Sequence, residues 1–72
     1  MKRVPVESEA MRGVGYDGPR RVLEIEFVDH GVYDYFDVPP SVHRALMRAE
    51  SHGRYFAGHI RDRYAYERIG AG

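Results

Sequence analysis

The 72-residue sequence contains no cysteine, so neither a disulfide bond nor a thiolate zinc site can stabilise the fold. No apolar run approaches the roughly 20 residues of a membrane-spanning helix, and residues 1–5 lack the apolar stretch of a secretory signal. The formal net charge is zero, which argues against a general binder of polyanions. We therefore expect one cytoplasmic domain over residues 1–72, with its core within about residues 6–69, no membrane attachment and no cofactor.

Aromatic residues are abundant in this short chain, which has six tyrosines and three phenylalanines. Each aromatic side chain can bury roughly 150–250 Å². We expect these rings to supply the dense core that a chain without covalent cross-links needs.

Three segments in the first half of the chain have the patterns of strands. Residues 22–28 alternate apolar with acidic side chains, as in a half-buried strand. A turn signal at residues 17–20 separates this segment from a strand at residues 11–16, and a turn at residues 29–31 precedes a strand at residues 32–36. These segments predict a three-stranded antiparallel meander.

The turn at residues 29–31 decides which way Tyr33 and Tyr35 point, because a shift of one residue reverses the faces of a strand. A two-residue loop would place the Asp34 carboxylate in the core, at a cost of several kcal/mol. We therefore predict a three-residue loop with Gly31 in the left-handed region. This loop places Phe27 opposite Tyr33 and Ile25 opposite Tyr35, with both tyrosines facing inward as structural anchors of the fold.

Two short helices are predicted after Pro39 and Pro40, whose rings suit a first helical turn. The first carries one apolar stripe, and Ser51 is an N-cap candidate for the second. The stripe consists of Val42, Ala45, Leu46 and Ala49. Residues 61–68 are predicted to form an extended C-terminal tail that lies on the body. The predicted fold class is therefore α+β: a three-stranded antiparallel meander, two short helices and an extended tail.

Three groups of residues resemble functional motifs without meeting their requirements. Residues 13–18 fit the dinucleotide-binding glycine pattern, but a proline and a strand follow in place of a helix N-terminus. We interpret these glycines as sites of a bend or a close strand contact. The four histidines fit no zinc spacing, and no nucleophile–base pair is indicated. The acids Glu24, Glu26, Asp29, Asp34 and Asp37 could supply oxygen ligands for a divalent cation, but their spacing fits no known loop pattern. We interpret them as a solvated acidic sheet face. We expect no metal site and no catalysis.

Charge is segregated along the chain. Residues 22–39 hold five acids and no base, whereas residues 40–72 hold six arginines against three acids. The acidic sheet face would repel phosphate, and base-stacking sheets need outward aromatics among positive charge. The candidate surface for RNA or a nucleotide is therefore formed by arginines and tyrosines of the second half of the chain. It comprises Arg44, Arg48, Arg54, Arg61 and Arg63, with Tyr64 and Tyr66 as stacking partners. The alternative is that these arginines only solvate the helices and pair with nearby acids.

Six short strings occur in one order along the chain. They are Val-Gly-Tyr-Asp (14–17), Leu-Glu-Ile-Glu-Phe (23–27), Gly-Val-Tyr-Asp-Tyr-Phe-Asp-Val-Pro (31–39), Ala-Leu-Met (45–47), Gly-Arg-Tyr-Phe (53–56) and Tyr-Ala-Tyr (64–66). Together they resemble the KTSC domain, a small module named for the C-terminus of some lysyl-tRNA synthetases. Tyr33 and Tyr35 match the central tyrosine pair of the family, and His43 stands where a tyrosine is common. The resemblance implies a module that also occurs free-standing in bacteria and phages, with RNA binding as its proposed role.

The function expected from these observations is that of a small non-catalytic module that binds RNA or a nucleotide through the arginine and tyrosine surface. The alternative is an oligomeric protein-interaction module that encloses a small phosphorylated ligand between subunits. Apolar side chains on the outer sheet face favour such self-association. They are Val22, Val28, Val32 and Phe36.

Overall fold

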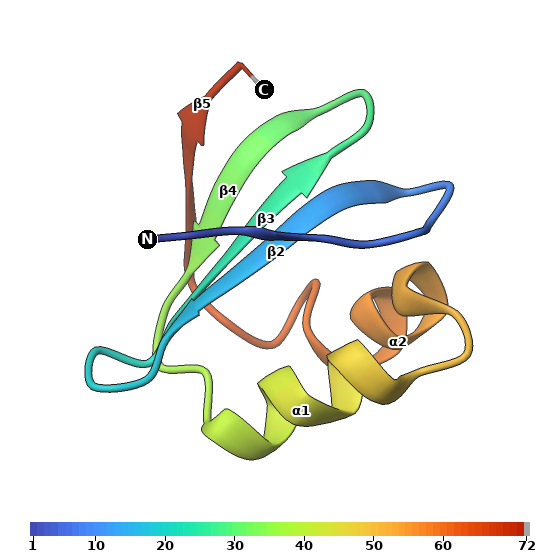
Figure 1. Cartoon of the computed structure of the whole chain (residues 1–72). Helices are drawn as coiled ribbons and strands as arrows, with labels where there is room; N and C mark the ends of the chain where they lie inside the picture. The colour runs from blue at the N-terminus through green and yellow to red at the C-terminus, as the bar shows by residue number, and fades with distance from the viewer. Residues whose placement is uncertain (72) are drawn as a thin grey trace.

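The computed structural model describes residues 1–71, which form a curled antiparallel sheet with two helices on one side (Figure 1). The elements in chain order are β1 (Val4–Pro5), β2 (Met11–Asp17), β3 (Val22–Phe27), β4 (Gly31–Tyr35), α1 (Pro40–Arg48), α2 (His52–His59) and β5 (Tyr66–Gly70). The order in the sheet is β1-β2-β3-β4-β5. No helix in the described part of the chain is long and apolar enough to cross a membrane.

The α+β class is confirmed, but the prediction of a three-stranded sheet is wrong, since the sheet has five strands. The predicted extended tail at residues 61–68 is wrong at residues 61–64, which form a turn and a bend, and is confirmed from Tyr66, where β5 begins. β5 pairs with β4 and sets Tyr66 opposite Tyr35. The additional N-terminal strand, β1, pairs with β2. A strand is recognised in a sequence when apolar and polar residues alternate because one face is buried. Neither strand meets this condition, because β1 has only two residues and Tyr66 to Ile69 of β5 are all exposed.

The turn between β3 and β4 has three residues, as predicted, but it begins one residue earlier than predicted. The pairs are Phe27 with Gly31, Ile25 with Tyr33, and Leu23 with Tyr35, so the predicted partners are wrong by two residues. A shift of two residues keeps each side chain on its predicted face. The inward orientation of both tyrosines is therefore confirmed.

Gly31 is required at this turn for two reasons. Its φ is +93°, a conformation that side-chain-bearing residues rarely adopt. A Cβ at this position would also collide with the carbonyl oxygen of Gly70 on β5. The predicted left-handed glycine is thus confirmed, and it also lets β5 approach β4.

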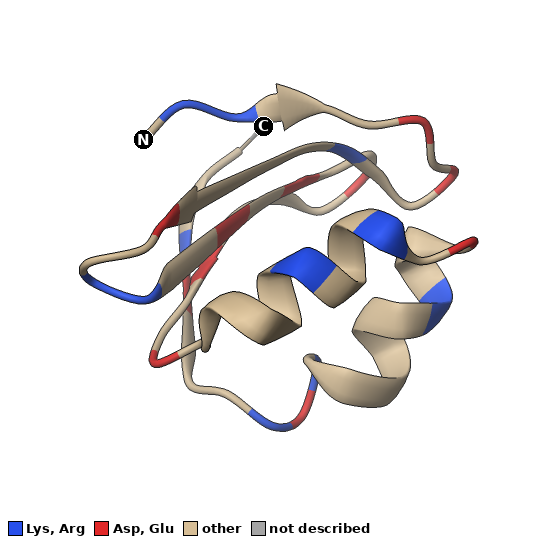
Figure 2. Cartoon of the chain, turned by 60° about the horizontal axis from the view of Figure 1, so that its bottom comes forward, with Lys and Arg blue, Asp and Glu red and all other residues tan. Residues whose placement is uncertain are grey.

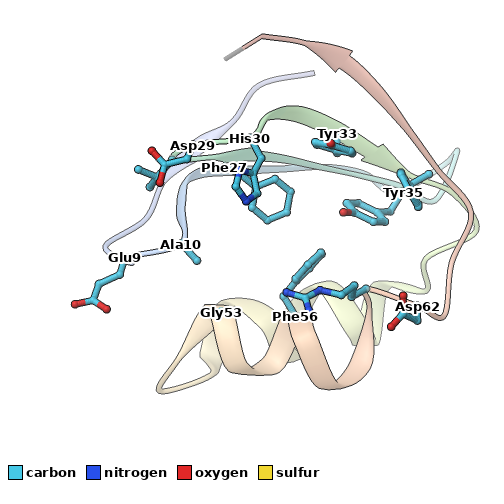
Figure 3. A pocket seen from close by; sticks show the side chains of 13 residues that line it. Glu9, Ala10, Phe27, Asp29, His30, Tyr33, Tyr35, Gly53, Phe56 and Asp62 are labelled. Carbon is cyan, nitrogen blue, oxygen red and sulfur yellow. The ribbon is translucent and has the colours of Figure 1, made fainter.

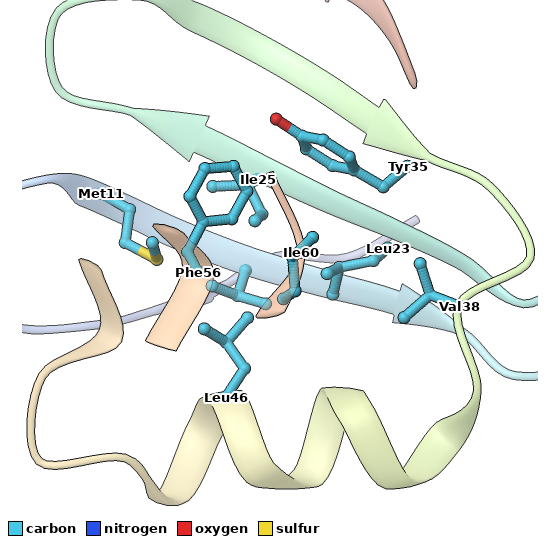
Figure 4. Close-up of a cluster of buried hydrophobic side chains, with 9 residues drawn as sticks. Met11, Leu23, Ile25, Tyr35, Val38, Leu46, Phe56 and Ile60 are labelled. Carbon is cyan, nitrogen blue, oxygen red and sulfur yellow. The ribbon is translucent and has the colours of Figure 1, made fainter. Parts of the chain in front are cut away.

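The helices supply the second half of the core (Figure 4). Leu46 from α1 and Phe56 from α2 are buried against the inner face of the sheet. Ser51 is the N-cap of α2, as predicted, because its side chain accepts a hydrogen bond from the Arg54 amide at 3.2 Å. The buried hydrophobic cluster comprises Met11, Val14, Leu23, Ile25, Tyr35, Val38, Leu46, Phe56 and Ile60.

The outer face of the sheet lies under the N-terminal segment (Figure 2). Arg3 Nη1 donates a hydrogen bond to Glu24 Oε2 at 2.6 Å, and Arg3 Nε lies 3.6 Å from Glu26 Oε1. Glu24 is only 7% exposed as a result. The predicted solvated acidic face is therefore wrong at Glu24, because the covering segment could not be placed from sequence.

Three acids form one cross-strand row on this outer face, with Asp34 between Glu24 and Glu67. Asp34 Oδ1 is buried and has no hydrogen-bond partner among residues 1–71. Burial raises the pKa of Asp34 to about 6, and the neighbouring carboxylates of Glu24 and Glu67 add to this effect. The positive charge of the N-terminus acts in the opposite direction on the pKa of Asp34, and Arg3 contacts the row only at Glu24.

Gly15 lies where the N-terminal segment crosses β2. A Cβ at Gly15 would lie 2.9 Å from the carbonyl oxygen of Lys2, a distance that real side chains do not tolerate. The close strand contact inferred from the glycine pattern is therefore confirmed at this position.

Asp34→Asn is expected to stabilise the protein at pH 7.5 and to stabilise it less at pH 4.5. The folded pKa of about 6 lies above the ordinary value of 3.8, so the stability contributed by protonated Asp34 is complete below pH 3.8 and is lost as the pH rises through 6. The gain at pH 7.5 should be roughly 1 kcal/mol, reduced for the screening of a partly exposed group. Urea unfolding of both proteins at both pH values measures it. Equal gains at the two pH values would contradict this interpretation.

Gly15→Ala is expected to destabilise the fold by about 1–3 kcal/mol, because the added methyl group must displace the backbone at Lys2. Gly58→Ala is the matched control, since nothing lies within 4 Å of its Cβ position in α2. It should stabilise the fold by about 0.5–1 kcal/mol through helix propensity. Thermal unfolding compares the two variants, and a neutral Gly15→Ala would show that the N-terminal segment does not pack closely on β2.

Candidate functional site

A pocket of about 430 Å³ opens between the inner face of the sheet and α2 (Figure 3). Its walls are mainly aromatic, with polar and charged side chains at the rim. The aromatic lining residues are Phe27, Tyr33, Tyr35, Phe56 and Tyr66, and the ionisable ones are Glu9, Asp29, His30, Arg61 and Asp62.

Strand alternation and register bring three tyrosines to this pocket. Tyr33 and Tyr35 are two residues apart on β4, so both point inward, and Tyr66 lies opposite Tyr35 on β5. The centroid of the Tyr66 ring is 5.7 Å from the centroids of both Tyr33 and Tyr35. These three residues, called the tyrosine cluster below, form a wall of rings on the sheet side.

Phe56 forms the opposite wall from α2. Its ring meets Phe27 and Tyr35 edge-on, with centroid distances of 5.1 and 5.4 Å. The guanidinium carbon of Arg61 lies 6.0 Å from the Phe56 centroid, within the range of a cation–π contact. The Phe56 ring thus belongs to the core on one side and supports a positive charge at the pocket on the other.

The members of the tyrosine cluster differ in exposure. Tyr35 is 4% exposed, whereas Tyr66 is 59% exposed. Burial raises the pKa of Tyr35 to about 12, with a further contribution from Tyr33 and Tyr66. Tyr35 therefore remains a neutral phenol at physiological pH, and Tyr66 presents an accessible ring. The arrangement can hold a flat ring by stacking and offer it hydroxyl groups for hydrogen bonding.

The structure brings only two of the seven predicted binding residues to this pocket, Arg61 and Tyr66. Figure 2 shows the arginines of the helices, where Arg44, Arg48 and Arg54 are exposed and do not line the pocket. Arg63 is exposed and Tyr64 half-buried in the segment between α2 and β5, also outside the lining.

Sequence reasoning assigned Tyr33 and Tyr35 a structural role alone and did not include Phe27 or Phe56 in a site. The available signal was the inward register of β4, which predicts that aromatic rings gather on one face. The pocket beside those rings depends on how α2 packs against the sheet, and no local sequence pattern predicts that packing.

The histidines pack against separate partners. The His43 ring stacks on Tyr16 with centroids 4.6 Å apart. Burial lowers the pKa of His43, and the charge of Arg44 contributes to this shift. His59 stacks on Tyr55 at 4.2 Å. Within residues 1–71, no three acidic or histidine side chains are grouped so that they could hold a metal ion.

Comparison with known proteins shows the family of this chain. A sequence model described as the KTSC domain matches residues 7–64. An uncharacterized protein of Stutzerimonas stutzeri is 46% identical over 56 residues, covering 78% of this chain and 79% of the relative. A lysine–tRNA ligase of Nostoc punctiforme is 35% identical over 63 residues, which are 88% of this chain but 11% of the ligase.

A crystal structure of a KTSC domain protein from Yersinia pestis superposes with a TM-score of 0.95. It is 40% identical in sequence, and the match covers 96% of this chain and 97% of that one. The shared fold thus includes nearly the whole chain, and the matched residues 7–64 contain every aromatic lining residue except Tyr66. The chain therefore belongs to the KTSC domain family.

Proposed function

We propose that this domain is a non-catalytic binding module that holds an unpaired base of single-stranded RNA, or a nucleotide, in the aromatic pocket. The observation that carries the proposal is the lining of five aromatic rings with the Arg61 guanidinium beside them. Stacking of one base on an aromatic side chain contributes roughly 1–3 kcal/mol. An accessible Tyr66 ring next to a buried Tyr35 phenol supplies both a stacking surface and a hydrogen-bonding group.

The dimensions of the pocket agree with such a ligand. A volume of about 430 Å³ falls within the range of roughly 300–1,000 Å³ for small-molecule sites. A base of a single strand can unstack from its neighbours and enter such a pocket, whereas the bases of a duplex remain paired and stacked.

Charge at the rim sets the expected strength of binding. Arg61 lines the pocket and Arg63 follows in the same exposed segment, so phosphates are expected on this side. Glu9, Asp29 and Asp62 also line the rim and oppose an anion. We therefore expect modest affinity that falls as salt rises.

The family relationship supports an RNA ligand, because similar segments occur in proteins named as lysine–tRNA ligases. The oligomeric alternative, with a phosphorylated ligand enclosed between subunits, receives less support. The apolar residues that favoured it are partly covered within one chain, since Val32 is buried and Val22, Val28 and Phe36 are half-buried.

Tyr66→Ala is expected to weaken binding of a labelled seven-nucleotide single-stranded RNA by about 5- to 150-fold, the equivalent of one lost stacking contact. Because Tyr66 is 59% exposed, the substitution should spare the fold. Fluorescence anisotropy at 50 mM salt measures the affinity.

Arg61→Ala should weaken binding of the same RNA several-fold, and the affinity should depend less on salt between 50 and 200 mM. Arg20→Ala is its control, since it removes the same charge from a side chain that is 82% exposed in the turn between β2 and β3. The control should bind RNA nearly as well as the wild type. Absence of RNA binding by the wild type at 50 mM salt, or equal losses in Arg61→Ala and Arg20→Ala, would contradict the proposal.

A further inference from the structure

The strand β5 forms one edge of the sheet, with β4 as its neighbour and its other side free (Figure 1). Residues Tyr66 to Ile69 are exposed on both faces of this strand. The opposite edge of the sheet, β1, has only two residues. An additional strand therefore has one edge of useful length available.

The backbone direction along this edge follows from one hydrogen bond. The Phe36 amide donates to the Ala65 carbonyl oxygen at 2.9 Å, so the polar backbone groups of Ala65 point toward β4. The pairing remains regular as far as Arg68, and backbone groups alternate in direction along a strand. Tyr66 and Arg68 therefore direct their N–H and C=O groups to the free edge, where an extended chain can pair with them.

The outer side of this edge carries negative charge at Glu67. The acid row of Glu24, Asp34 and Glu67 ends at β5. Arg3 contacts the row at Glu24, and the N-terminal ammonium lowers the pKa of Asp34, but within residues 1–71 no base forms an ion pair with Glu67. In a sixth strand, the side chain opposite Glu67 would extend this row. A basic side chain is favourable at that position, and an acidic one is not.

The inner side of the same edge adjoins the aromatic pocket at Tyr66. The neighbours of the basic residue in a sixth strand would point to this inner side, because side chains alternate. Apolar side chains there would cover the exposed Tyr66 ring at the mouth of the pocket.

A second copy of this chain does not meet these requirements. Two antiparallel β5 strands related by a two-fold axis can pair Tyr66 with Tyr66, Tyr66 with Arg68, or Arg68 with Arg68 of the copy. These three registers set Glu67 against Ala65, Glu67 or Ile69 of the copy, and none of these residues is basic.

We propose that the free edge of β5 binds an extended segment of a partner protein, with a basic side chain opposite Glu67 and apolar neighbours at the mouth of the aromatic pocket. Backbone hydrogen bonds to Tyr66 and Arg68 supply the attachment, and the charge of Glu67 supplies the selectivity. This interaction goes beyond the proposed binding of RNA, since it uses the strand edge and the outer acid row.

The first test compares two labelled, capped peptides, Ser-Val-Lys-Val-Ser and Ser-Val-Glu-Val-Ser. The wild-type protein should bind the lysine peptide at least fivefold more tightly by fluorescence anisotropy, and Glu67→Lys should reverse this order. Equal affinities for the two peptides, an unchanged order in Glu67→Lys, or no binding of either peptide at millimolar concentration would overturn the proposal.

The second test removes the backbone donor at the free edge. Arg68→Pro deletes the outward N–H without removing a hydrogen bond to β4, a position at which edge strands accept proline. Arg68→Ala is the control, because it removes the same side chain and keeps the N–H. The lysine peptide should bind Arg68→Ala and not Arg68→Pro. Equal binding to both variants would overturn the role of the edge. If Arg68→Pro does not fold, the charge reversal in Glu67→Lys still tests the proposal.

Discussion

The packing of Phe56 on Phe27 and Tyr35 connects the helical layer to the sheet. These edge-on contacts, at 5.1 and 5.4 Å, hold α2 against the inner face. The chain has no disulfide bond to supply that connection, and aromatic pairs of this geometry add roughly 0.5–1.5 kcal/mol beyond burial alone. Because the same rings line the pocket, the contact that stabilises the fold also shapes the candidate site.

The two faces of the sheet have different chemistry, and the alternation of side chains along β3 and β4 keeps them apart. The inner face presents the tyrosine cluster to the pocket, and the outer face presents the acid row beneath Arg3. An anionic ligand is therefore expected on the inner side near Arg61, whereas a cationic partner is favoured where the acid row reaches Glu67 at the edge.

Much of this arrangement follows from sequence, and the remainder depends on contacts between distant segments. The cost of burying Asp34 predicts the inward orientation of Tyr33 and Tyr35, although the exact partners differ by two residues because the turn begins earlier. The strand β1 and the pairing of the C-terminal tail with β4 were missed, since exposed or very short strands carry no burial pattern. The pocket was also missed, because the meeting of Phe27 with Phe56 depends on the docking of α2.

The proposed function depends on ligand binding in the aromatic pocket of this domain. Its most direct test is an NMR titration that follows the aromatic ¹H–¹³C signals during addition of single-stranded RNA. We predict progressive shifts of the Tyr35, Phe56 and Tyr66 ring signals, with little change at the stacked Tyr16 and His43 rings, which do not line the pocket. Saturable binding that leaves the three pocket rings unshifted would contradict the proposed function.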